Sequence, residues 1–185
     1  MRIDKLIQVV LLLAFPASIH AHSSLNNNSS TLSEGIRTDV SLTKDHFLQT
    51  GVPPGELKGP FEFKSDIYSG TSRRYWVFVP AQYDAKEAAS LLVFQDGHRA
   101  TNPNGSIRIQ TVMANLIAQK AMPVTIGLFI TPGNLSDAYP NDLGWSNPNH
   151  RWQEYDVVND TYARFLIEEM IPVLAKQYHL TDDPD

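Results

Sequence analysis

The chain has 185 residues, of which 42% are hydrophobic and 19% are charged, and it contains no cysteine. This composition is globular, and the length fits one domain or a large part of one. A formal net charge of −5 gives the protein no general attraction for nucleic-acid phosphates, so no nucleic-acid partner is expected. The absence of cysteine excludes disulfides, thiolate metal sites and a cysteine nucleophile.

The start of the chain is typical of a secretory signal peptide that covers residues 1–21. Arg2 and Lys5 flank the start of an apolar run over residues 6–15, and small residues follow it. This run is too short to span a bilayer, so we expect a cleaved leader, no integral membrane span after its removal, and a secreted or periplasmic protein. Residues 22–59 are polar and then rich in proline and glycine, which predicts a flexible leader followed by turns.

Residues 60–185 predict an α/β domain that begins with an antiparallel hairpin. The segments 61–68 and 73–79 are rich in aromatic and β-branched residues, and a Ser-Gly-Thr-Ser turn separates them. Along the second segment, apolar side chains alternate so that they occupy both sides of the strand. We therefore expect this strand to be covered on both faces.

The next part of the chain predicts a right-handed parallel βαβ unit. Two short apolar runs, 91–95 and 124–130, are typical of strands buried on both faces. Between them, apolar residues at helical spacing predict a helix that is N-capped by Ser106 and ends near Lys120. A connection of this length between two strands favours parallel pairing.

A further helix is expected after an irregular stretch. Asp156 is its predicted N-cap, and Val158, Tyr162 and Phe165 share its apolar face. Pro172 is expected to break or kink this helix. In an α/β protein the loop after such a helix leads into another strand, so residues 60–185 predict an incomplete architecture.

Two motifs are candidates for a functional site. Asp96-Gly97-His98-Arg99 follows the first buried strand, and ligands in open α/β sheets bind beyond the carboxyl ends of strands. An ordinary Asp-Gly turn is the alternative. The second motif is Arg151-Trp152-Gln153-Glu154-Tyr155-Asp156, whose charges and rings could bind a polar, ring-bearing substrate. A surface ion pair and a helix cap are its alternatives.

These stretches together resemble the esterase family of the esterase D and enterochelin esterase type, which are α/β-hydrolases. The resemblance is carried, in the family's order, by RRYWVFVP (73–80), LLVFQDGHRA (91–100), PVTIGLFITPG (123–133), RWQEYD (151–156) and YARFLIEEMIPVLAKQY (162–178). It implies an α/β-hydrolase fold, here its N-terminal part only, and a serine esterase that hydrolyses carboxylic esters.

The resemblance also implies roles for individual residues. The backbone N–H of His98 would form half of an oxyanion hole, which needs a fixed donor but no particular side chain. Asp96, Gly97 and Arg99 would hold the polar part of a small-molecule or polysaccharide-linked ester. Arg151 and Glu154 would line the mouth of the site.

The sequence departs from the family at the nucleophile. No G-x-S-x-G elbow occurs in the 185 residues, and Gly144-Trp145-Ser146-Asn147-Pro148 fails at its last position. We therefore expect the Ser/Asp/His triad beyond Asp185, and this chain to be the inactive N-terminal portion of a secreted esterase. His46, His150 and His179 are expected at the surface.

Other readings of the sequence stay open. Trp145, Trp152 and Tyr155 could stack on a sugar in a non-catalytic extracellular carbohydrate-binding module. A fragment without a function of its own is a third possibility. The metal-binding patterns H-x-x-x-H and H-E-x-x-H are absent, and no glycine-rich phosphate loop follows either buried strand, so we expect no metal and no cofactor.

Overall fold

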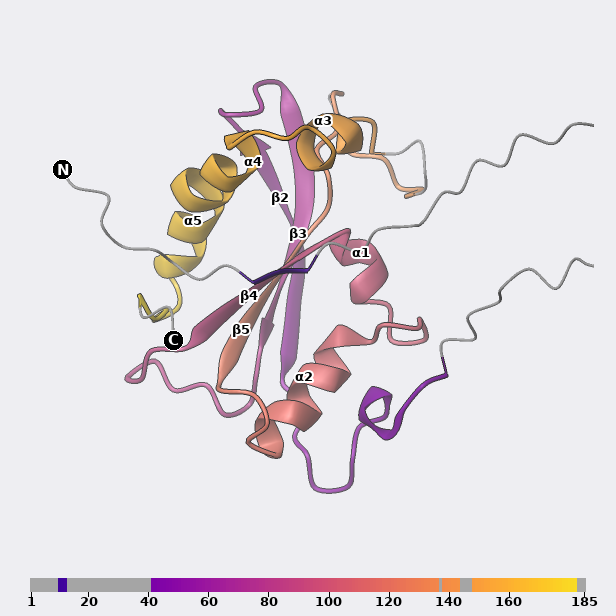
Figure 1. The fold of residues 1–185 in the computed structure, drawn as a ribbon, viewed down its shortest axis with the longest axis vertical. Coiled ribbons are helices and arrows are strands. Elements are labelled where there is room, and N and C mark those ends of the chain that lie inside the picture. The colour runs from indigo at the N-terminus through magenta and orange to yellow at the C-terminus, as the bar shows by residue number, and fades with distance from the viewer. Residues whose placement is uncertain (1–9, 13–40, 137, 144–147, 183–185) are drawn as a thin grey trace, which may run out of the picture.

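The computed structural model describes residues 10–12, 41–136, 138–143 and 148–182. At its centre lies a five-stranded sheet in the order β1-β4-β5-β3-β2 (Figure 1). The strands are β1 (Val10–Leu12), β2 (Glu56–Ser65), β3 (Thr71–Val79), β4 (Ser90–Gln95) and β5 (Thr125–Ile130). β2–β3 and β3–β5 pair antiparallel, whereas β1–β4 and β4–β5 pair parallel.

The predicted hairpin is confirmed, although its first strand begins earlier than expected. β2 starts at Glu56, so the prediction of turns up to residue 59 is wrong for its last four residues. The pairing shifts register between Lys58 and Phe61, which lets this proline- and glycine-containing segment remain in the sheet. The hairpin turn is held to the last helix by Glu169, whose carboxylate accepts hydrogen bonds from Ser65 Oγ (2.6 Å) and the Ile67 N–H (2.8 Å).

The parallel pair β4–β5 and the helix between them are also confirmed. Two helices lie in the connection: the short α1 (Gly97–Ala100) and the longer α2 (Ile109–Ala118). The predicted cap at Ser106 is wrong, because the residue before α2 is Arg108, which is left-handed with φ 47°. This backbone turn sets the start of α2 in place of a hydroxyl cap.

The last helix differs from the prediction at its start, and it is not broken at its proline. Asp156 ends the short helix α3 (Arg151–Tyr155), and the chain becomes helical again at α4 (Thr161–Arg164). The helix then continues through the wider π turns of η2 (Phe165–Met170) into α5 (Ile171–Ala175). Proline has no N–H to donate, and its ring clashes with the carbonyl four residues earlier. The widened turns before Pro172 therefore let the helix pass it without ending.

The sheet is buried on both faces, as the alternation in β3 predicts. Tyr75 and Val77 pack with α4, η2 and α5 on one face, and Phe78 packs with α1 and α2 on the other. Figure 1 shows these two groups of helices on opposite sides of the sheet. The buried residues of the central strand β5 contribute to both clusters: Ile126, Leu128 and Ile130 to the first, and Phe129 to the second.

Part of the segment expected to be a flexible leader is ordered against α2. The side chain of Asn115, which is fully buried, donates from Nδ2 to the carbonyls of Asp45 (2.9 Å) and Phe47 (2.8 Å). Its Oδ1 accepts from the Gln49 N–H at 3.1 Å. These bonds dock residues 45–49 on the helix. The ordered body therefore begins before the predicted boundary at residue 59.

The apolar run expected to belong to a signal peptide also contributes to the sheet. Its residues 10–12 form β1, which pairs with Leu92, Val93 and Phe94 of β4. The remaining residues of the predicted leader, up to residue 40, lie outside the described part of the chain. Within the described residues, every helix is too short or too polar to cross a membrane.

Candidate functional site

The first candidate motif lies at the carboxyl end of β4, where the strand turns directly into α1. Asp96 makes this turn in the left-handed region, with φ 53° and ψ 39°. Gly97 follows and packs directly on β5, because a Cβ at this position would lie 2.5 Å from the carbonyl carbon of Phe129 and 2.7 Å from the amide nitrogen of Ile130. The strand-to-helix turn therefore depends on a residue without a side chain, and it places α1 against β5.

This turn leaves backbone donors at the carboxyl end of the strand. The first N–H groups of a helix have no acceptor within the helix, and the amide of His98 is one of them. Around it, Asp96 is buried and Arg99 is exposed. The geometry can thus present a fixed N–H donor to a polar group of a ligand.

Asp96 is held by Arg151 of α3. The guanidinium donates from Nη2 to Oδ2 (3.0 Å) and from Nε to Oδ1 (3.2 Å), a two-point pairing typical of arginine and carboxylate. The hydrogen bonds to Asp96 raise the pKa of Arg151 above its ordinary value. The Arg151 guanidinium also lies 5.1 Å from the centre of the Tyr155 ring. The structure thus brings the two sequence motifs together through one ion pair.

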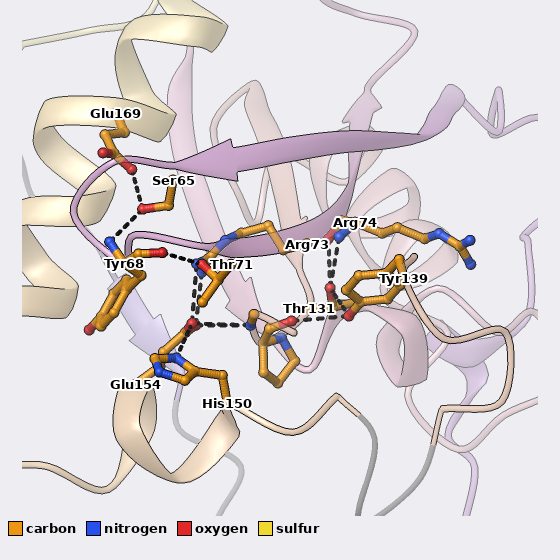
Figure 2. A network of polar contacts seen from close by, with 12 residues as sticks. Ser65, Tyr68, Thr71, Arg73, Arg74, Thr131, Tyr139, His150, Glu154 and Glu169 are labelled. Atoms are coloured by element: carbon orange, nitrogen blue, oxygen red, sulfur yellow. Dashed lines mark hydrogen bonds and ion pairs between the residues drawn. The ribbon is translucent and has the colours of Figure 1, made fainter. Parts of the chain in front are cut away.

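Glu154, three residues further along α3, points in a different direction, into the interior. It is 3% exposed, and its carboxylate accepts from Arg73 Nη1 (2.8 Å) and Nη2 (3.1 Å). The Gly133 N–H, just after β5, donates to both of its oxygens at 3.2 Å. Figure 2 shows Glu154 at the centre of this network, below β3. Its carboxylate is occupied by internal partners and does not face a site mouth.

Arg73 is itself fully buried, which makes this ion pair unusual. Its guanidinium lies 4.0 Å from the centre of the Phe165 ring, and its Nη2 also donates to Thr71 Oγ1 at 3.0 Å. The pair therefore ties β3, the loop after β5 and α3 together. Since α3 also carries Arg151, the buried pair sets the position from which Arg151 reaches Asp96.

His150 is only partly exposed, so the expected surface position describes it less well than it describes His179. Its side chain is 14% exposed, and Nδ1 lies 3.0 Å from Glu154 Oε1. The ring also meets Tyr68 edge to face, with 5.6 Å between ring centres. Burial, followed by the nearby charge of Glu154, raises the pKa of Tyr68 to about 12. His46 and His179 do lie among the exposed or partly exposed residues.

The His98 side chain is more enclosed than its neighbour Arg99. Both of its ring nitrogens are buried, and neither has a hydrogen-bond partner among the described residues. Burial lowers the pKa of His98, and the nearby carboxylate of Asp96 opposes this shift in part. A neutral imidazole in this position fills space beside the turn, while the backbone N–H remains the polar group that the turn presents.

The aromatic residues of α3 do not form one exposed surface. Trp152 is 65% exposed, whereas Tyr155 packs its ring at 5.2 Å from Tyr162 and has a buried hydroxyl. Burial raises the pKa of Tyr155 well above its ordinary value. The third ring of the sugar-stacking hypothesis, Trp145, lies outside the described residues, as does Ser146.

Arg73 is the residue that sequence reasoning missed, although the sequence carried a signal for it. Alternate residues of a strand point to the same face, so Arg73 shares a face with Tyr75, Val77 and Val79. That face was predicted to be covered. A buried arginine requires an acidic partner. The partner could not be identified from spacing, because Glu154 is 81 residues away. No cluster of metal-ligating side chains occurs in the described part of the chain.

Comparison with known proteins agrees with this fold. The model of a family described as "Putative esterase" matches residues 68–184. No match was found to a curated protein sequence. Among solved structures, the ferulic acid esterase of Anaeromyces mucronatus superposes with a TM-score of 0.52 at 18% identity, covering 75% of this chain and 49% of that one. The enterobactin esterase of Shigella flexneri gives a TM-score of 0.45 at 19% identity, covering 67% and 26%.

The hairpin, the parallel pair and the helices on both faces of the sheet form part of an α/β-hydrolase fold. The chain belongs to this esterase family, because the family match covers most of its length. It spans about half the length of the first ferulic acid esterase structures that it matches, which are covered to 49% and 48%.

Proposed function

We propose that the chain is the N-terminal portion of a secreted serine esterase, and that the β4–α1 turn supplies half of its oxyanion hole. The observation that carries this proposal is the turn itself. Gly97 presses α1 onto β5, and this packing fixes the amide of His98 at the carboxyl end of a buried strand. Such a donor stabilises the negative oxygen of a tetrahedral intermediate in ester hydrolysis.

In this proposal, the charged residues around the turn have different tasks. Arg151 and Asp96 hold each other at the rim, and Arg99 is exposed beside them, so these residues can contact the polar part of an ester. Glu154 acts from the interior by fixing α3 through Arg73. The substrate class is a carboxylic ester of a small molecule or of a polysaccharide. Siderophore-like, aryl, acetyl and small acyl esters all satisfy this description.

The nucleophile is proposed to lie on a strand that follows this part of the domain. No G-x-S-x-G sequence occurs in the 185 residues. After α5, the chain returns to the sheet, where Leu180 forms a parallel bridge with Ala89, just before β4. A strand continuing in that direction would run parallel to β4, and its carboxyl end would lie beside the β4–α1 turn. This arrangement would place a nucleophile close to the His98 amide.

We expect residues 22–185 to hydrolyse p-nitrophenyl acetate no faster than a heat-denatured sample of the same protein. An oxyanion donor without a nucleophile and base retains only a small part of the rate enhancement. The assay is paired with a fluorophosphonate probe, which labels activated serines. Stoichiometric labelling of any serine would contradict the proposal, and Ser146 would then be the first serine to replace.

The carbohydrate-binding alternative receives less support. Of its three aromatic residues, Trp152 is exposed but the Tyr155 ring is packed against Tyr162 and Arg151. Of the two described rings, only Trp152 is thus well exposed for stacking on a sugar. The ester hydrolase is therefore the function that we propose.

A further inference from the structure

The connection between α1 and α2 turns outward from the sheet (Figure 1), and it carries an Asn-Gly pair, Asn104 and Gly105. Asn104 is exposed. Its backbone N–H donates to Asn102 Oδ1 at 2.9 Å, whereas its side-chain amide makes no hydrogen bond to the described part of the chain. The side chain of Asn104 is therefore free to rotate toward the backbone that follows it.

Gly105 presents its backbone nitrogen with no side chain beside it. Its N–H donates to the Asn102 carbonyl at 3.1 Å, toward the long end of the usual range, so this hydrogen is not tightly held. Arg108 closes the turn by donating from Nε to the Gly105 carbonyl at 2.9 Å. A Cβ at Gly105 would lie 3.3 Å from Asn102, so a larger residue would fill the space around this nitrogen.

The chain has a related pair in Asp96-Gly97, which the fold closes to the same chemistry. The Asp96 carboxylate is buried and held at both oxygens by Arg151, so it cannot rotate onto the next nitrogen without breaking these bonds. Gly97 is packed against the backbone of Phe129. Of the two pairs, the one in the α1–α2 connection combines a free side-chain carbonyl with an open backbone nitrogen.

We infer that Asn104 and Gly105 form a self-modification site, at which the asparagine is converted spontaneously to aspartate and isoaspartate. The Gly105 nitrogen attacks Cγ of Asn104, and the new N–Cγ bond forms as the Cγ–Nδ2 bond breaks. The Gly105 amide proton and the Nδ2 group leave together as ammonia, and a five-membered succinimide ring remains. Water then adds to one of the two ring carbonyls and opens the ring.

The two products change the turn in different ways. Opening at Cγ gives an ordinary aspartate, which adds one negative charge. Opening at the backbone carbonyl of Asn104 gives the isoaspartyl form, which adds the same charge and also places the Cβ methylene in the main chain. That extra atom lies between the Asn102 carbonyl and the Gly105 N–H, which are bonded to each other in the unmodified turn.

Peptide mass spectrometry of the full chain, kept folded in mildly alkaline buffer, measures the conversion. Trypsin cleaves after Arg99 and Arg108 and releases residues 100–108, in which loss of the amide at Asn104 is read from the fragment masses. Labelling by an isoaspartyl methyltransferase reports the second product. A synthetic peptide of residues 100–108 shows how fast the same sequence reacts without the fold.

The chain supplies two internal controls. Asn102, in the same tryptic peptide, is followed by Pro103, which has no N–H and cannot form the ring. Asn159 is exposed, as Asn104 is, but its Oδ1 accepts from the Thr161 N–H at 2.9 Å, and the residue after it carries a side chain.

In the folded chain, we expect Asn104 to convert at least about tenfold faster than Asn159, and at least about tenfold faster than in a Gly105→Ala variant, whose methyl group obstructs the attack. The methyltransferase should label the aged wild type and not the variant. Equal rates at Asn104 and Asn159, or in wild type and variant, would overturn the inference. So would a folded chain that stays unmodified while the synthetic peptide reacts, or conversion to aspartate without isoaspartate.

Discussion

Replacing Arg73 with Met should destabilise the protein by about 3–5 kcal/mol, the cost typical of removing one partner from a buried ion pair. Arg73 and Glu154 are both inaccessible to solvent, and their two-point contact is 2.8 and 3.1 Å long. Without the guanidinium, the Glu154 carboxylate stays buried, and among the described residues it keeps only the Gly133 amide and His150 as partners. The measurement is the free energy of unfolding in urea, with the slope checked for constancy.

An exposed Arg–Glu pair offers a control for this experiment. Arg164 and Glu168 lie one turn apart with Nε and Oε1 at 3.0 Å, but both side chains are about half exposed. Glu168→Gln should leave the denaturation midpoint unchanged, because exposed pairs are screened by solvent. The double variant Arg73→Met with Glu154→Gln should be closer to wild type than the sum of the single losses. Strict additivity, or a small loss for Arg73→Met, would contradict a structural role for the buried pair.

Replacing Gly97 with Ala should be the most damaging single change in the β4–α1 turn. The added Cβ would meet backbone atoms of Phe129 and Ile130 at 2.5 and 2.7 Å, and backbone cannot rotate away as a side chain can. Overpacking of this kind costs about 1–3 kcal/mol, occasionally more, and here the relief must come from moving α1 off β5. We expect a lower unfolding midpoint together with altered chemical shifts for the His98 amide.

Gly105→Ala is the matched control for the Gly97 variant. It lies in the loop before α2, and an added Cβ would come no closer than 3.3 Å to Asn102. We expect its unfolding midpoint and the His98 amide resonance to match those of the wild type. If Gly97→Ala behaved as Gly105→Ala does, the packing of the turn would not be what fixes this amide.

The sequence was sufficient for the central part of the fold, because local patterns there agree with tertiary burial. The segments that form β4 and β5 are apolar throughout, which predicts strands that are buried on both faces. The alternating apolar residues of β3 pack into the two buried clusters on opposite faces of the sheet. Capping was predicted less well. Ser106 and Asp156 have suitable side chains, but the chain begins α2 with a left-handed residue and ends α3 at Asp156. Where a helix begins and ends depends on how the adjoining loops cross the sheet, and a local sequence pattern carries no information on that.

The candidate site could be predicted in part for the same reason. Asp96 and Gly97 were identifiable because a buried strand ends there and the Asp-Gly pair marks a turn. The pairing of Asp96 with Arg151 spans 55 residues, and that of Arg73 with Glu154 spans 81. Contacts at such separations are set by the assembled sheet. Residues three apart on a helix are neighbours on its surface, so the spacing could not show that Arg151 pairs with Asp96 while Glu154 pairs with Arg73.

The central claim is that this chain carries the oxyanion turn of a serine esterase whose nucleophile lies on the next strand. Reading the gene past the codon for Asp185 tests it most directly. The account predicts a short apolar strand followed by G-x-S-x-G within about 20 residues. The Leu180–Ala89 bridge already directs the chain along β4 toward the turn at Asp96. Downstream sequence with neither an apolar strand nor that serine motif would contradict the account.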